Sequence, residues 1–102
     1  RNYRVLPGSP DIAITKSKIA IFIDGEFWHG YDWENKKQLL NRNRDYWIQK
    51  IEENMARDKR NDLALQSMNW KVLHFWEKTA LHYSDYCVEL IKYEIRNQTP
   101  DK

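Results

Sequence analysis

The most restrictive feature of this sequence is a continuous run of five apolar residues, Ile19 to Ile23, which ends abruptly in polar and aromatic residues. An apolar run without polar alternation predicts a strand that is buried on both faces. The residues that follow, Asp24 to Gly30, bring acidic groups, two glycines, large aromatic rings and an imidazole to the end of this strand. Reactive groups at the exit of a rigid strand are typical of a functional site.

A shorter apolar run precedes this strand and begins with an acidic residue. Pro10 and Asp11 open the run Ile12–Ile14, and only four polar residues, 15–18, separate it from the longer run. Such a short connection predicts a hairpin, which would place Asp11 near the end of the neighbouring strand. A carboxylate beside a backbone carbonyl offers the oxygen ligands that Mg²⁺ prefers. The sequence therefore predicts a metal site of the kind that nucleases use.

Length and composition limit the class of protein. A chain of 102 residues predicts one domain spanning 1–102 with one modest core. The single cysteine, Cys87, excludes an internal disulfide and a zinc site built on several thiolates. We find no secretory signal and no apolar run of membrane length, so we expect no membrane partner and a cytoplasmic protein.

The net charge of +2 identifies no partner, but the distribution of charge is more informative. Four basic residues precede the long predicted helix: Lys36, Lys37, Arg42 and Arg44. Such a cluster can contact DNA phosphates, although a solvated helix face is its commoner meaning. The five tryptophans and six tyrosines fit either a small core or stacking on bases.

The remainder of the chain predicts helices and one further strand. Apolar residues in steps of three and four predict a helix from about Arg44 to Met68, facing inward through Trp47, Ile48, Ile51, Met55, Leu65 and Met68. A strand over 70–76 and an amphipathic helix over 85–96, with Cys87, Leu90, Ile91 and Ile95 inward, are expected to follow. We expect a first strand at 1–5, a loop over 25–40 and a connector over 79–83. The predicted fold is a small α/β sandwich, a mixed β-sheet flanked by helices.

Two acidic residues continue the inward stripe of the long helix. Asp58 comes three residues after Met55, and Asp62 comes four residues after Asp58. Burying a lone carboxylate is costly, so an inward-facing carboxylate needs a partner. The imidazole of His29 at the strand exit would be such a partner for Asp58.

Four segments of the sequence, taken together, resemble a known family. They are residues 6–11, 22–30, 46–58 and 70–77, and in this order and spacing they resemble the very short patch repair (Vsr) endonucleases over nearly the whole chain. Vsr-like homing endonuclease catalytic domains share the pattern. The resemblance implies a restriction-endonuclease-like fold, a bacterial or phage-encoded protein, and Mg²⁺-dependent hydrolysis of a phosphodiester bond in double-stranded DNA, as in nicking beside a T:G mismatch.

The resemblance also implies roles for individual residues. Asp11 would bind the metal together with the backbone carbonyl of Ile23. His29 would be the catalytic histidine, oriented by Asp58. The aromatic residues at the positions that wedge into the duplex are Phe27, Trp28 and Trp47.

The sequence departs from the family in three places. Asp24 stands where the mismatch-repair members carry a second histidine, and it is either a further catalytic residue or a turn residue before Gly25. No structural zinc is expected, because Glu26, Tyr31, Trp33 and Lys78 occupy the corresponding neighbourhood. An N-terminal helix bearing a glutamate is absent, so the domain lacks that helix or is a fragment of a longer chain with other domains. A homing or restriction-linked nuclease module, or a catalytically inactive DNA-binding module, are the alternatives.

Overall fold

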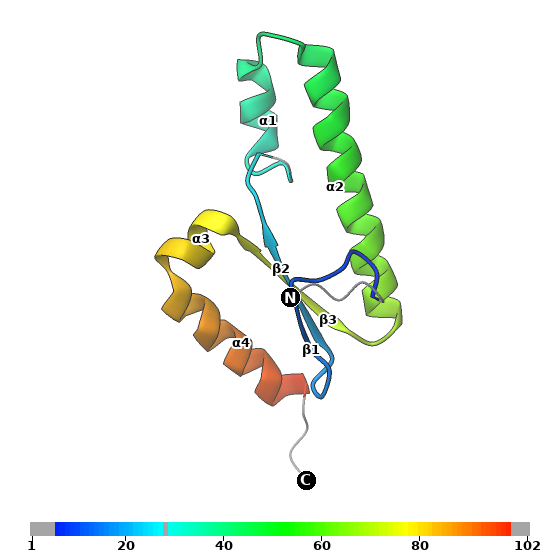
Figure 1. Ribbon diagram of the computed structural model, residues 1–102, viewed down its shortest axis with the longest axis vertical. Helices are drawn as coiled ribbons and strands as arrows, with labels where there is room; N and C mark the ends of the chain where they lie inside the picture. The colour runs from blue at the N-terminus through cyan, green and yellow to red at the C-terminus, as the bar shows by residue number, and fades with distance from the viewer. Residues whose placement is uncertain (1–5, 28, 99–102) are drawn as a thin grey trace.

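A three-stranded mixed β-sheet with helices on both faces lies at the centre of the computed structural model, which describes residues 6–27 and 29–98 (Figure 1). Its elements are β1 (Ile12–Ile14), β2 (Ile19–Asp24), α1 (Trp33–Lys36), the 3-10 helix η1 (Lys37–Leu39), α2 (Arg44–Ser67), β3 (Lys71–Trp76), α3 (Glu77–His82) and α4 (Ser84–Gln98). The predicted α/β class, with a mixed sheet flanked by helices, is confirmed. Within the described ranges, no helix is both long and apolar enough to cross a membrane.

The strand β2 is central and pairs with a different neighbour along each edge. It runs antiparallel to β1, with Ile12 opposite Ile21, and parallel to β3, with Asp24 opposite Trp76. The predicted hairpin is confirmed: its turn closes with a hydrogen bond from the N–H of Lys18 to the carbonyl of Thr15, 3.3 Å long. A parallel pair requires a long crossover, and the segment containing α2 provides it.

Successive side chains of β2 point to opposite faces of the sheet, and both faces are covered except at Ile23, which is 41% exposed. Ala20 and Phe22 pack toward α2 in a cluster that includes Leu65. Ile19 and Ile21 pack toward α4 in a second cluster around Cys87, which Leu90, Ile91 and Ile95 flank as predicted. Figure 1 shows α2 on one side of the sheet and α4 on the other. Burial of both faces explains why the β2 sequence has no polar alternation.

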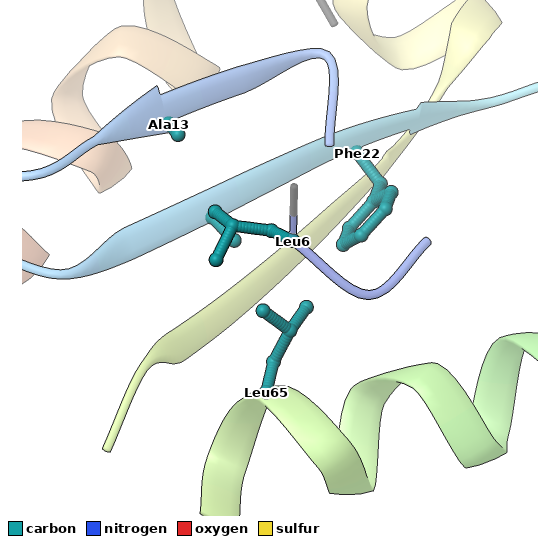
Figure 2. Packing of buried hydrophobic residues seen from close by; sticks show 5 residues of the cluster. Leu6, Ala13, Phe22 and Leu65 are labelled. Atoms are coloured by element: carbon teal, nitrogen blue, oxygen red, sulfur yellow. The ribbon is translucent and has the colours of Figure 1, made fainter. Parts of the chain in front are cut away.

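The α2-side cluster holds the long helix against the sheet. Figure 2 shows Leu65 pointing from α2 toward the sheet, with Leu6 and Phe22 close to it. Leu65 is fully buried, whereas the predicted inward residues Met55 and Met68 are 37% and 43% exposed. Those two expectations were wrong: Met55 lies in the half of α2 that extends beyond the sheet, and Met68 comes after the last helical residue, Ser67.

The N-terminal half of α2 extends beyond the sheet and lies beside α1 (Figure 1). The buried Trp33 of α1 donates from its indole Nε1 to Glu52 of α2 over 2.9 Å. Asn43 occupies the N-cap position of α2 with a φ of 52° and no side-chain cap, and Asn69, with a φ of 68°, follows the end of the helix. The hydrogen bond from Trp33 to Glu52 therefore joins α1 to α2.

Two predicted loops contain short helices. The segment 25–40 holds α1 and η1, and the expected connector over 79–83 is largely occupied by α3. Helices this short span fewer than two turns, so they leave no readable periodicity and depend on tertiary contacts. The strand expected at 1–5 lies outside the described residues.

We expect Leu65→Ala to destabilise the fold strongly, by about 2–5 kcal/mol, because it leaves a cavity between α2 and the sheet. The matched control is Leu63→Ala on the same helix, where the side chain is 57% exposed; its effect should stay within about 0.5 kcal/mol. Urea unfolding followed by circular dichroism measures both. Equal losses in the two variants would contradict the assigned packing of α2.

Candidate active site

A cavity of about 310 Å³ lies where the C-terminal ends of β2 and β3 face α2. Its lining residues include Gly8 and Ser9 from the segment before β1, Asp24 and His74 from the sheet, and His29, Arg57, Asp58 and Asp62. A neighbouring cavity of about 280 Å³ shares the same histidines and three aspartates. The cavities thus gather two imidazoles and three carboxylates at one edge of the sheet.

The first imidazole, His29, contacts Asp58 as the sequence predicts. The Nδ1 of His29 lies 2.5 Å from Oδ2 of Asp58, and both side chains are 25% exposed. A carboxylate accepts hydrogen bonds, so Nδ1 carries the proton and donates it, which leaves Nε2 for another partner. A carboxylate bonded to one ring nitrogen fixes the tautomer and the orientation of the ring.

The loop after β2 folds tightly enough to bring His29 to α2. The N–H of His29 donates to the carbonyl of Gly25, and that of Tyr31 donates to the carbonyl of Glu26. Gly30 has a φ of 78°, and a Cβ there would collide with the sulfur of Met55. A glycine is therefore required where the loop passes against the helix.

The second imidazole, His74, lies between two carboxylates. Its Nδ1 is 2.6 Å from Oδ2 of Asp24, and its Nε2 is 2.8 Å from both oxygens of Asp62. The ring also stacks on Phe22, with 4.9 Å between ring centroids. Burial of the ring opposes protonation, but the hydrogen bonds to Asp24 and Asp62 outweigh it and raise the pKa of His74 from 6.5 to about 9.

His74 is the site residue that the sequence did not reveal. Asp62 was visible on the helix stripe, and Asp24 was a candidate, but nothing in the sequence joined them to a histidine 50 positions after Asp24. The usable signal was the two-residue period of the last strand, which places His74 on the same face as Val72 and Trp76.

Asp11 lies beside β2 as predicted. Its Oδ2 accepts the N–H of Ile23 over 2.8 Å. The N–H and carbonyl of a strand residue point toward the same neighbouring strand, so the Ile23 carbonyl is also directed to the Asp11 side. Ile23 lies beyond Ile21, the last residue of β2 that pairs with β1.

Two of the three aromatic residues predicted to wedge into the DNA duplex, Phe27 and Trp47, lie together at the start of α2. Phe27 lies edge-on to Trp47, with 5.6 Å between ring centroids, and Trp47 also meets Tyr46 edge-on. Phe27 is 42% exposed, and Trp47 is half-buried. Trp28 lies outside the described residues.

The four predicted basic residues lie at the junction of α1, η1 and α2. Lys37 pairs with Glu34 and Glu52, while the Arg44 guanidinium donates to the backbone carbonyls of Lys37 and Leu40. The Lys36 ammonium lies 5.3 Å from the centre of the Tyr31 ring, and Arg42 is exposed. Lys37 and Arg44 therefore help to join the two helices.

Comparison with known proteins identifies the sequence family. The family model for the DNA mismatch endonuclease Vsr matches residues 1–35. The Type II nicking enzyme V.HpaIIP of Haemophilus parainfluenzae is 49% identical over 81 residues, which are 79% of this chain and 57% of that protein. The family-model match and this relative support a Vsr-like endonuclease family for the chain.

Two further relatives agree with this assignment. The Type II nicking enzyme V.NmeDIP of Neisseria meningitidis serogroup C is 41% identical over 91 residues, or 89% of this chain and 62% of that protein. The DNA mismatch endonuclease Vsr of Escherichia coli is 38% identical over 72 residues, or 71% of this chain and 46% of that protein. The chain thus spans roughly half to three fifths of the length of these relatives. Its three-stranded sheet with flanking helices is consistent with the restriction-endonuclease-like fold of Vsr-like proteins.

The neighbourhood where the Vsr resemblance places zinc is built differently in this chain. Oε2 of Glu26 accepts the N–H of Lys78, which lowers the pKa of Glu26. Tyr31 meets Trp76 edge-on, and Trp33 binds Glu52. These positions supply no thiolate or imidazole, the usual ligands of structural zinc, so they do not fit that ion.

The Asp11 neighbourhood supplies only part of the coordination that a hard cation such as Mg²⁺ requires. The second carboxylate oxygen of Asp11 and the Ile23 carbonyl are the oxygen ligands that suit Mg²⁺, an ion that keeps several waters. Among residues 6–27 and 29–98, no group of three or more His, Cys, Asp or Glu side chains is arranged to hold a metal. Any ion bound there would complete its coordination with water or with a ligand phosphate.

The raised pKa of His74 predicts a pH-dependent contribution to stability. The folded-state pKa of about 9 exceeds the unfolded value of 6.5, so the contribution is fully present below pH 6.5 and disappears as the pH rises through about 9. The difference in unfolding free energy between the wild type and His74→Gln should shrink over this range. Urea titrations at several pH values measure it, and a difference that is constant with pH would contradict the assignment.

Proposed function

We propose that this chain carries the catalytic centre of a DNA endonuclease that nicks double-stranded DNA with the help of a divalent metal such as Mg²⁺. One observation carries the proposal: the His29–Asp58 pair opens into a cavity at the strand ends, with Asp11 bound to the adjacent part of β2. Relatives whose names describe nicking enzymes and a mismatch endonuclease support it. The roles assigned to His29, Asp58 and Asp11 are part of the same proposal.

His29 acts as the general acid–base group of the reaction. Asp58 holds the proton on Nδ1, so Nε2 is available to accept a proton from the attacking water or to return one to the leaving oxygen. The pair is half-buried, which keeps it in one orientation while leaving it accessible to substrate. Acid–base assistance of this kind typically contributes about 10²- to 10⁴-fold in rate.

Asp11 and the Ile23 carbonyl would hold the metal. A bound divalent cation would offset the charge that develops on the scissile phosphate and orient water beside it. The hydrogen bond from the Ile23 N–H holds the Asp11 carboxylate in place at the strand edge. The position of Asp11 therefore depends on the backbone of the central strand.

Duplex DNA is the proposed partner, approached from the side of the sheet that faces α2. Phe27 and Trp47 offer aromatic surface close to the His29 loop, and such rings insert between base steps in proteins that bend DNA. Lys36 and Arg42 are the proposed phosphate contacts from the basic cluster. Asp24 is proposed to act in the site through its hydrogen bond to His74.

A DNA-binding module without catalysis is the second candidate. It is favoured by the scarcity of metal ligands, because the described residues contain no group of three or more ligating side chains. Incubating supercoiled plasmid with the protein in Mg²⁺ or in EDTA separates the two candidates. Metal-dependent conversion to the open circle supports the nuclease, and binding without conversion supports the inactive module. Short duplexes with and without a T:G mismatch then test substrate preference.

Asp11→Asn is expected to abolish nicking while leaving DNA binding unchanged or stronger. The amide oxygen of Asn can still accept the Ile23 N–H, so the loop should be retained, whereas the charge needed by the metal is lost. Plasmid nicking and fluorescence anisotropy with labelled duplex measure the two effects. Wild-type nicking by Asp11→Asn in Mg²⁺ would rule out the proposed metal site.

His29→Ala and Asp58→Ala should each lower the single-turnover rate, by about 10²-fold or more for His29. The double variant should be little slower than His29→Ala alone, because Asp58 acts through the imidazole. His82→Ala serves as the control, since His82 is an exposed histidine of α3. Losses that add independently in the double variant would show that the two residues do not act as a pair.

A further inference from the structure

The second carboxylate–imidazole cluster has no part in the proton transfer proposed above. Asp24 ends β2, His74 lies in β3 and Asp62 lies in α2, so the cluster joins three elements at the wall of the cavity. Asp62 comes one helical turn after Asp58, which binds His29. The two clusters are therefore held on one face of one helix.

Counting donors and acceptors fixes the charge of this cluster. Both ring nitrogens of His74 lie within 2.8 Å of carboxylate oxygens, and carboxylates only accept hydrogen bonds. Each nitrogen must then carry a proton, so His74 is an imidazolium between two anions. The raised pKa of His74 agrees with this count. Since both N–H groups are already bonded, the ring cannot exchange a proton with a substrate while the cluster is intact.

The cavity would be strongly negative without this cation. Three carboxylates line it, those of Asp24, Asp58 and Asp62, whereas Arg57 is the other cationic side chain in the lining. A DNA phosphate entering the cavity meets these charges at short range, where like charges repel appreciably. Any group that neutralises the carboxylates from within the protein lowers this repulsion.

We propose that His74 is a positioning residue that serves as the built-in counter-cation of the site, holding Asp24 and Asp62 together and reducing the negative charge that a DNA phosphate meets. This rests on the proposed function, because it takes DNA as the ligand. His74 acts through the two carboxylates and does not itself touch the reacting atoms. Stacking on Phe22 fixes the plane of the ring, so the two bonds keep their directions.

The role can be tested in folded variants, although the contacts of His74 also contribute to stability. Leu65 and Phe22 already hold α2 against the sheet, and the His74 side chain remains 30% exposed. His74→Gln keeps a polar side chain of similar length and removes the charge. Asp62→Asn keeps the shape of the side chain and removes one anion. Together the two substitutions separate charge from packing.

The test measures the affinity of the full chain for labelled duplex DNA in EDTA, so that neither cleavage nor metal binding enters the readout. His74→Gln should weaken binding by about 3- to 10-fold at an ionic strength of about 0.01 M, and the difference should shrink at about 0.1 M, where the Debye length falls to about 10 Å. Adding Asp62→Asn to this variant should restore most of the lost affinity. His82→Gln, the control on α3, should bind like the wild type.

Two further measurements do not depend on how well His74→Gln folds. Asp62→Asn alone should bind DNA more tightly than the wild type, because it removes an anion and leaves the cation. In the wild type, nitrogen NMR at neutral pH should show both ring nitrogens of His74 protonated. A neutral ring, unchanged binding in folded His74→Gln, a loss that persists at higher salt, or weaker binding by Asp62→Asn would each overturn the proposal.

The outcomes also separate this proposal from the one on which it rests. If the wild type neither binds nor nicks DNA, the proposed function fails and the counter-cation role falls with it. If the wild type binds and nicks DNA but the His74 and Asp62 variants show no dependence on charge, the endonuclease assignment stands and only the role of His74 is rejected.

Discussion

Burial of the central strand on both faces is the constraint on which the rest of this structure depends. Because side chains of β2 alternate between faces, Ala20 and Phe22 must pack toward α2 while Ile19 and Ile21 pack toward α4. The same alternation turns Asp24, the last residue of the strand, toward α2, where it is 8% exposed. A carboxylate in that position requires a partner, and His74 of the neighbouring strand supplies it.

The helix α2 converts this sheet face into a site because three of its successive inward positions serve different purposes. Leu65 anchors the helix in the apolar cluster, Asp62 binds His74, and Asp58 binds His29. Spacings of three and four residues keep these side chains on one face of the helix. A rigid helix fixed by its core contact therefore sets the positions of both histidine–aspartate clusters, which is the support that a site on a flexible loop would lack.

Much of the fold was predictable from local patterns. The two strands of the hairpin, the long helix, the last strand and the last helix were found within about two residues of their bounds, because each is long or bounded by clear turn residues. The helices α1 and α3 were not found, since each is too short to show a period. The predicted inward stripe of α2 was right at Ile51 and Leu65, which are fully buried, and wrong at Met55 and Met68, which are exposed.

The contact between His29 and Asp58 was predictable because both partners carry local signals: one leaves a buried strand, and the other continues an apolar stripe. The sequence by itself thus determined the α/β class, the strand-exit loop, the helix face that carries Asp58 and the family resemblance. Only the tertiary structure decided that His74 bridges Asp24 and Asp62. The physical reason is that this bridge depends on the parallel register of β2 with β3, in which Phe22 lies opposite His74 and Asp24 opposite Trp76. Register between strands that are some fifty residues apart is set by the packing of the whole sheet, and no local pattern encodes it.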